Sequence, residues 1–389
     1  MDTAFEQQVR NMAAAMRFPE PVYVTRPNLP PLDTVTGMLA AAWERQWLTN
    51  DGALHRQLED ELVRLLEVPH LSLFCNGTIA LLTALEALSL ENGEVITTAF
   101  TFPATVNVLH WHRLRPVFCD IRPDTYNLDP AGIEALIGPD TKAILPVHVY
   151  GTPCDVNAIN DIADKHGLPV IYDAAHAFGV RLRGESVLGH GNLSMLSFHA
   201  TKVFTTAEGG ALVTQDPELH RRTCLLKNFG ITGEESVEAP GLNGKMNEMQ
   251  AALGLAQLAG LDANTDKRRC LDGIYRRLLK EEPGLVLLDL PSDVEPNYAY
   301  FPVRVREDAF GMSRNTLYNA LKAFNIQCRK YFHPLCSTNP WCRLETGALP
   351  HSEAAASEVL CLPIYGTLPE SWAETIGTII RSLGALARA

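Results

Sequence analysis

The sequence predicts an α/β fold in which helices cover a mainly parallel sheet and a smaller C-terminal α/β domain follows. Apolar runs of four to six residues recur from Leu71 onward, and helical patterns separate most of them. Beyond about Ala263 the pattern shifts to a smaller unit. Short buried strands that alternate with helices form a parallel sheet with both faces covered, so these observations define the fold class.

The N-terminal region has two parts. Residues 1–32 mix a short helical pattern with a proline-rich extended piece, a composition that suits an arm lying on a surface, its own or a partner subunit's. A helix is expected from about Leu32 to Trp47, followed by a polar turn. Leucines at three-to-four spacing between Leu54 and Leu66 then predict an amphipathic helix.

The central region alternates strand, turn and helix. Strands are expected at residues 71–74, 95–98, 116–119, 143–147, 169–172, 193–197 and 210–214, with helices that include 79–90 and 156–166. In the C-terminal unit we expect a strand at 299–305, a helix at 313–324 and a final helix whose apolar stripe packs in the core. The predicted divisions are an arm (1–32), a large domain (33–262) and a small domain (263–389).

Composition excludes several classes of function. The chain has 33 basic and 45 acidic residues and a net charge of -12, which argues against a nucleic-acid partner. Its nine cysteines contain no Cys-x-x-Cys pair, which favours reduced thiols in a cytoplasm over disulfides or a metal site. We find no signal-peptide pattern and no apolar run of membrane-spanning length. The sequence therefore predicts a cytoplasmic protein with no metal and no membrane partner.

Two strand ends deliver groups suited to a ligand, because such sheets bind ligands beyond the carboxyl ends of their strands. Gly77 and Thr78 open a helix directly after the first strand, so backbone N–H groups and a hydroxyl could hold a phosphate. An ordinary helix-capping turn is the alternative. Asp173 ends another buried strand, where its carboxylate would need a cationic partner. Its alternative role is to cap the next turn.

A lysine supplies the third group. Lys202 lies in a loop between two short strands, with Ser197 and His199 nearby, and could carry a carbonyl cofactor as a Schiff base. By itself, a loop lysine is usually a solvated charge. Together with the phosphate site and Asp173, however, Lys202 fits pyridoxal 5′-phosphate, whose ring nitrogen an aspartate keeps protonated. Phe102 could stack on that ring or belong to the core. No dinucleotide or ATP motif is present.

Several segments together resemble the DegT/DnrJ/StrS family of sugar aminotransferases, a branch of the fold type I pyridoxal-phosphate enzymes. The most specific is Ser197-Phe198-His199-Ala200-Thr201-Lys202, followed by Glu208-Gly209-Gly210. The others are Asn76 to Thr78, Phe100 to Thr105, Thr125 to Pro130, Pro146 to Gly151, Asp173 to Gly179, Gly241 to Met246 and Lys330 to Leu335.

The resemblance implies a role for each matching residue. Lys202 would be the Schiff-base lysine that moves the proton, and Asp173 the partner of the pyridine nitrogen. Gly77, Thr78 and Ser197 would hold the phosphate, Phe102 would stack on the ring, and Asn243 would reach the phosphate of a neighbouring subunit in a homodimer. Many members have glutamine where this chain has His176. His176 could contact the ring or its O3′ atom, or be a core histidine.

The resemblance also implies a reaction, namely transfer of an amino group from L-glutamate to a nucleotide-linked keto-deoxy sugar. Asp173 to Gly179 and Lys227 to Gly230 are similar to the branch that aminates C4, as in dTDP-4-keto-6-deoxyglucose. Amination at C3, dehydration and a pyridoxal-phosphate-binding regulator without turnover remain alternatives. Family dehydratases replace the lysine by histidine, which disfavours dehydration. Substrate contacts are expected from Thr49, Asn50, Lys330, Tyr331 and His333.

Overall fold

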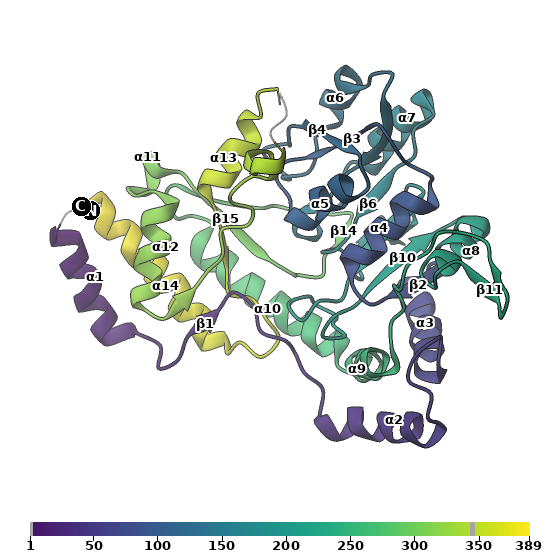
Figure 1. Cartoon of the computed structure of the whole chain (residues 1–389). Coiled ribbons are helices and arrows are strands. Elements are labelled where there is room, and N and C mark those ends of the chain that lie inside the picture. The colour runs from purple at the N-terminus through teal and green to yellow at the C-terminus, as the bar shows by residue number, and fades with distance from the viewer. Residues whose placement is uncertain (1–2, 343–346) are drawn as a thin grey trace.

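A mainly parallel sheet forms the centre of the large unit (Figure 1), in a computed structural model that describes residues 3–342 and 347–389. One part has the order β2 (His70–Phe74), β10 (Gly210–Thr214), β9 (Leu193–Ser197), β6 (Ile171–Asp173), in which β10 is antiparallel to both neighbours. The other part has the parallel order β4 (Arg115–Cys119), β3 (Glu94–Thr98), β5 (Thr141–Leu145). Parallel bridges join β5 to β6, so the two parts form one sheet. All seven predicted strands are present, and the predicted fold class is confirmed.

Helices cover both faces of this sheet, because alternate strand residues point to opposite sides. Leu196 and Ala211 pack with α3 (Ala53–Leu66) and α9 (Glu248–Leu258). Met195 and Leu212 pack with α4 (Gly77–Ala87) and α5 (Pro103–Trp111). The remaining helices of the large unit are α2 (Leu32–Arg45), α7 (Val156–His166) and α8 (Pro217–Leu226). The leucine spacing that predicts α3 buries one apolar stripe of this helix against the sheet.

The C-terminal unit is built on an antiparallel sheet with the order β13 (Leu285–Leu287), β15 (Phe301–Val305), β17 (Val359–Leu362). Its helices are α10 (Leu261–Leu279), α11 (Glu307–Phe310), α12 (Arg314–Ala323), α13 (Pro350–Glu358) and α14 (Glu370–Arg388). Ile376 and Leu383 in the apolar stripe of α14 are fully buried and Trp372 is partly buried against the same core, so the predicted core role of the stripe is confirmed.

The N-terminal segment packs against the C-terminal unit of its own chain. Val9 and Ala13 of α1 (Thr3–Met16) share a core with α12 and α14, and β1 (Val22–Tyr23) pairs in parallel with β16 (Ile326–Gln327). The chain then runs as a strap to α2 in the large unit (Figure 1). The proposed division at residues 32 and 262 stays a prediction.

Short elements complete the described chain. They are α6 (Pro130–Ile133), β7 (Arg181–Leu182), β8 (Glu185–Ser186), β11 (Ile231–Gly233), β12 (Ser236–Val237) and β14 (Val294–Glu295), with 3₁₀ turns at Glu134–Leu136, Val149–Gly151, Val187–Gly189, Cys336–Thr338 and Pro340–Cys342. None of the helices among residues 3–342 and 347–389 combines the length and the apolar character needed to cross a membrane.

Two helical glycines give a matched test of the packing between α3 and α9. A Cβ atom at Gly254 of α9 would lie 2.7 Å from Leu58 Cδ2 and 2.9 Å from Thr206 Cγ2, and Leu58 is fully buried. We expect Gly254→Ala to destabilise the protein by about 1–3 kcal/mol through overpacking. Gly273 of α10 has no atom within 4 Å of the equivalent position, so Gly273→Ala should stabilise its helix by about 0.5–1 kcal/mol. Thermal unfolding followed by circular dichroism measures both, and equal shifts would contradict the expected overpacking.

Candidate active site

A cavity of about 590 Å³ opens at the carboxyl ends of the central strands. The start of α4, the segment before α5, the residues after β6 and the β9–β10 loop line it from the large unit. Tyr300 and the segment from Arg329 to Phe332 reach it from the C-terminal unit. The expected site at this edge of the sheet is therefore a real cavity that both units share.

The start of α4 forms a cradle at one end of the cavity. Asn76 caps the helix by accepting a hydrogen bond from Ile79 N at 2.8 Å. The N–H groups of Gly77 and Thr78 lie in the first turn, where the helix itself provides no acceptor. Ser197, at the end of β9, lines the cavity beside them. These groups match the chemistry of a bound phosphate, which accepts hydrogen bonds and is favoured at a helix N-terminus.

Glycines allow the cradle to form. A Cβ atom at Gly77 would lie 3.1 Å from Met195 Sδ and 3.2 Å from Ser197 Cβ. A Cβ atom at Gly210 would lie 2.7 Å from the backbone nitrogen of Gly77. Because backbone atoms cannot move aside as a side chain can, Gly210 lets β10 lie directly against the helix start.

Asp173 presents a buried carboxylate at the end of β6. Only 4% of the residue is exposed. Thr105 Oγ1 donates to its Oδ2 at 2.7 Å, and the backbone N–H of Ala175 donates to its Oδ1 at 3.0 Å. Burial raises the pKa of Asp173, although these two hydrogen bonds and the charge of Lys202 oppose that rise. A cationic ligand atom would stabilise the ionised carboxylate, as a protonated pyridine nitrogen does.

Lys202 reaches the same cavity from the β9–β10 loop. Its Nζ atom lies 3.3 Å from the hydroxyl oxygen of Tyr300. Burial lowers the pKa of Lys202 to about 8, and the negative charge of Asp173 acts in the opposite direction. An amine with this pKa is partly uncharged near neutral pH, which is the form that attacks a carbonyl carbon.

His176 is a buried residue that also lines the cavity. Its Nδ1 atom accepts a hydrogen bond from the backbone N–H of Tyr150 at 3.2 Å. Burial lowers the pKa of His176 well below its ordinary value, so the ring is neutral and its proton lies on Nε2. The ring stacks on Phe332 with 5.8 Å between centroids. His176 is therefore a packed histidine that also borders the cavity, and its contact with a cofactor stays a prediction.

The two other histidines of interest differ. His148 is fully buried, accepts from Cys154 N at 3.0 Å and stacks on Tyr172, so it has a packing role. His199 is exposed and lines the cavity. Phe102 also lines the cavity, and 55% of it is exposed, which excludes the alternative that it is a core residue.

The side chains of residues 329–333 divide between the cavity and its surroundings. Arg329 and Tyr331 line the cavity, whereas Lys330 points away, with its Nζ atom 4.4 Å from the ring centre of Tyr318. His333 is exposed and lies outside the cavity. The sequence motifs named Lys330 and missed Arg329, because no local pattern shows which of these two side chains reaches the cavity.

Asn243, Thr49 and Asn50 lie outside the cavity of their own chain and are exposed. Asn243 pairs through its backbone with Asn228. Thr49 and Asn50 belong to the α2–α3 loop.

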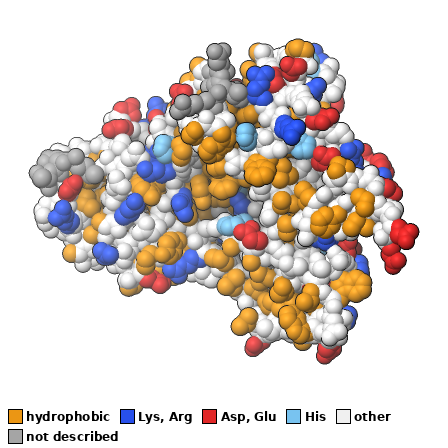
Figure 2. Space-filling model, in the orientation of Figure 1, with side chains coloured by type: hydrophobic (Ala, Val, Ile, Leu, Met, Phe, Trp, Pro, Cys, Tyr) orange, Lys and Arg blue, Asp and Glu red, His pale blue; other side chains and the backbone are white. Residues whose placement is uncertain are grey.

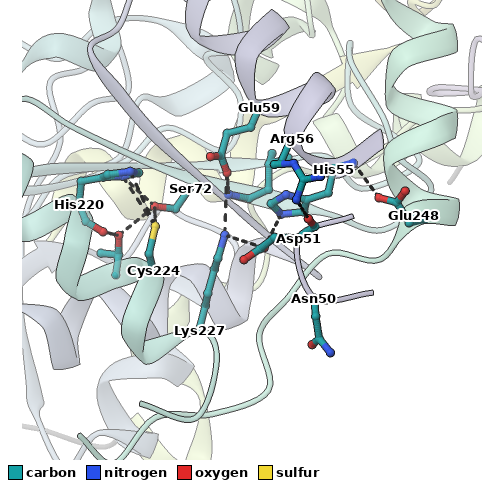
Figure 3. A network of polar contacts seen from close by, with 12 residues as sticks. Asn50, Asp51, His55, Arg56, Glu59, Ser72, His220, Cys224, Lys227 and Glu248 are labelled. Atoms are coloured by element: carbon teal, nitrogen blue, oxygen red, sulfur yellow. Dashed lines mark hydrogen bonds and ion pairs between the residues drawn. The ribbon is translucent and has the colours of Figure 1, made fainter. Parts of the chain in front are cut away.

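A buried polar cluster fixes that α2–α3 loop (Figure 3). Asp51 Oδ1 lies 3.8 Å from the Nζ atom of Lys227 and 3.5 Å from the Nε2 atom of His55. Glu248 accepts hydrogen bonds from the first N–H groups of α3, at Leu54 and His55. The loop is therefore anchored to α3, α8 and α9 while its tip faces outward.

Comparison with solved structures identifies the class of protein. The structure matches that of DesI in the presence of its TDP-sugar product with a TM-score of 0.91 and 35% identity, over 98% of this chain and 96% of that chain. It matches the aminotransferase TlmJ from Streptoalloteichus hindustanus with a TM-score of 0.88 and 27% identity, over 95% and 100% of the two chains. The fold is that of an aminotransferase.

Sequence comparison narrows the class to one family. The model of the DegT/DnrJ/EryC1/StrS aminotransferase family matches residues 33–381, so the chain belongs to this family. The chain is also 47% identical over 356 residues to the dTDP-4-amino-4,6-dideoxy-D-glucose transaminase of Escherichia coli, covering 89% of this chain and 94% of the relative. The family resemblance stated from the sequence motifs is thus confirmed.

The charge interaction between Asp173 and Lys202 predicts how the lysine titrates. In the protein without cofactor, the rate at which a trace amount of an amine-reactive reagent labels Lys202 should rise with pH, with a midpoint near pH 8. Because the carboxylate raises the pKa of the lysine, Asp173→Asn should move the midpoint to lower pH. Peptide mass spectrometry measures the labelling, with the exposed Lys280 as the internal reference. A midpoint that stays fixed or rises in the variant would mean that the two charges do not interact.

Proposed function

We propose that the protein is a pyridoxal-phosphate-dependent aminotransferase that moves an amino group from L-glutamate to C4 of dTDP-4-keto-6-deoxyglucose. The observation that carries the proposal is the convergence of Lys202, Asp173 and the start of α4 on one cavity in a member of an aminotransferase family. The similarity to a dTDP-4-amino-4,6-dideoxy-D-glucose transaminase supports the choice of sugar, nucleotide and carbon atom.

The cavity residues fit pyridoxal phosphate. Gly77, Thr78 and Ser197 offer donors for the phosphate, in a cradle that a Cβ atom at Gly77 would crowd. Asp173 offers a desolvated carboxylate for the ring nitrogen, Phe102 an exposed aromatic face, and His176 an N–H group for a phenolic oxygen. When bound, the cofactor supplies an aldehyde for amines and a ring that withdraws electrons from the neighbouring carbon.

Each catalytic residue of the chain then has a defined task. Asp173, whose carboxylate is buried, would hold the ring nitrogen in its protonated state through a charge-assisted hydrogen bond. Lys202, as an amine, would take the proton from the α-carbon of glutamate and return it to the carbon atom that the cofactor's aldehyde contributes. The pKa of about 8 suits this shuttle, since the lysine changes its protonation state close to working pH.

Both substrates are anions, and the cavity offers them a guanidinium group, hydrogen-bonding groups and aromatic faces. Arg329 and His199 line the cavity, as does the ring of Tyr331. A guanidinium group binds carboxylates and phosphates through paired hydrogen bonds, so we assign Arg329 to the donor carboxylate or the sugar diphosphate. Lys330 and His333 lie further out and would contact only the distal part of a nucleotide sugar.

We further propose that the protein works as a homodimer with shared sites. Hydrophobic side chains gather over α2, at the lower edge of the space-filling view (Figure 2). Among them, Leu32 is 73% exposed, Trp43 60% and Trp47 55%. Such a patch favours burial against a second copy. The anchored tip with Thr49 and Asn50, and the loop with Asn243, would then complete the partner's cavity. A cytoplasmic location suits this chemistry and the free cysteines.

A substrate panel tests the proposed reaction. Purified protein with pyridoxal phosphate and glutamate should convert dTDP-4-keto-6-deoxyglucose to an amino sugar, detected by mass spectrometry, in preference to UDP- and GDP-linked keto sugars. Lys202→Ala should reduce turnover by at least about 10³-fold, because the Schiff-base amine is lost. Lys280→Ala, an exposed lysine of α10's C-terminal end, is the control. Amination at C3, loss of water from the sugar, or a cofactor band without turnover would each support a rival function.

Complementation tests the shared site. Lys202→Ala and Asn243→Ala should each lose most activity as pure proteins. When equal amounts are mixed and allowed to exchange subunits, half of the dimers carry one intact site, so about one quarter of wild-type activity should return. Gel filtration of the mixture verifies that dimers persist. If no activity returns although mixed dimers are present, Asn243 does not serve the site of the other subunit.

A further inference from the structure

Tyr300 is part of the cavity wall. Its hydroxyl oxygen lies 3.3 Å from Lys202 Nζ. Its ring centre lies 4.7 Å from that of His176, 5.7 Å from that of Tyr150 and 5.9 Å from that of Tyr331. The side chain comes from the C-terminal unit, just before β15, whereas Lys202 belongs to the large unit. The contact therefore joins the two units at the reactive amine.

The backbone before Tyr300 is held firmly. Asn297 is 5% exposed, and its Nδ2 atom donates to the carbonyl oxygens of His176 at 2.8 Å and Phe178 at 3.0 Å. Its Oδ1 atom accepts from Ala299 N at 3.0 Å. One amide side chain thus ties the Tyr300 segment to the residues that follow Asp173.

Helix α10 supports both partners of the contact. Asn264 Nδ2 donates to the carbonyl oxygen of Val203, next to Lys202, at 3.1 Å. Asn264 Oδ1 accepts from Nε of Arg268 at 3.2 Å, and Arg268 Nη1 reaches the carbonyl oxygen of Ala299 at 3.4 Å. Arg268 is 1% exposed, so its guanidinium group binds groups of the protein interior and not an ion from solvent. A buried polar chain therefore fixes Lys202 and Tyr300 relative to each other.

We propose that Tyr300 is a positioning residue for Lys202, whose hydroxyl group holds the free Nζ atom in line with the carbon atoms between which it carries the proton. The proposal rests on the proposed transaminase function and assigns it a residue that the motifs do not contain. A lysine stem is flexible and its ammonium group rotates freely, so a second fixed contact restricts where the amine can point.

The chemistry of a neutral phenol suits this task. Burial raises the pKa of Tyr300 well above its ordinary value, so the hydroxyl keeps its proton at working pH. The phenol oxygen can accept a hydrogen bond from the ammonium form of Lys202, and the O–H group can donate to the lone pair of the amine form. The contact can therefore persist in both protonation states, and Tyr300 neither gains nor loses a proton.

The test compares Tyr300→Phe with Tyr318→Phe as holoenzymes. Tyr318 is a half-buried tyrosine of α12 outside the cavity, and the Tyr300 variant keeps the aromatic ring. We expect kcat for Tyr300→Phe to fall about 10- to 100-fold with little change in KM for glutamate, because proton transfer is misaligned. The primary isotope effect with glutamate deuterated at its α-carbon should increase, since this proton transfer becomes more fully rate-limiting. Tyr318→Phe should leave all three values unchanged.

A second measurement needs no turnover. In the cofactor-free protein, the pH midpoint for labelling of Lys202 should be lower in Tyr300→Phe than in the wild type. The ammonium form loses a hydrogen-bond acceptor, and hydrogen bonds to a charged group are stronger than those to a neutral amine. Tyr318→Phe should not move the midpoint.

The outcomes separate this proposal from the proposed function. A folded Tyr300→Phe protein with wild-type kcat, isotope effect and labelling midpoint overturns the positioning role and leaves the transaminase intact. Impairment of Tyr300→Leu but not of Tyr300→Phe shows that only the ring matters, and overturns it equally. If the wild type aminates no keto sugar, the proposed function fails, and the labelling midpoint alone then decides whether Tyr300 holds Lys202.

Discussion

The burial of a carboxylate and an amine in one cavity is the constraint on which the rest of the structure depends. Removing either charge from water costs several kcal/mol, and Asp173 and Lys202 offset part of this cost for each other. The strand order places β6 and β9 side by side, so the end of one and the loop after the other meet at the same edge. Thr105 and the backbone N–H of Ala175 supply the remaining hydrogen bonds to the carboxylate. The cavity is thus polar at a few fixed points and otherwise enclosed by packed side chains.

The second unit completes this environment. The large unit provides the cradle, the carboxylate and the amine, and the C-terminal unit adds Tyr300, Arg329 and Tyr331. Helix α10 leads from one unit to the other and carries the buried Asn264 and Arg268. The position of the Lys202 amine therefore depends on side chains more than 60 residues away along the chain. A substitution of Arg268 would change that position although the two residues are not in contact.

The sequence predicted what local patterns encode. The seven strands, the amphipathic helix α3 and the apolar stripe of α14 follow from periodicity, and Asp173 and Lys202 follow from their places at strand ends. Tyr300 and Arg329 were missed, because their approach to the cavity depends on how the C-terminal unit docks, which no local pattern records. Lys330 lies against Tyr318 and outside the cavity, so its expected substrate contact stays a prediction. Asn243, Thr49 and Asn50 are exposed and lie outside the cavity of their own chain, so their roles stay predictions.

The strap between α1 and α2 has a consequence for motion. It pairs with β16, receives a hydrogen bond from Ile364 N at Val24 O (3.0 Å), and places Thr25 Oγ1 3.4 Å from the carbonyl oxygen of Thr201, beside Lys202. Further along, Gln257 of α9 donates to the carbonyl oxygen of Asn28. A segment fastened to both units works against hinge bending between them. Glutamate and the keto sugar should then enter and leave through a cavity of nearly constant width. Only the loops at the edge of the cavity should move to let them pass.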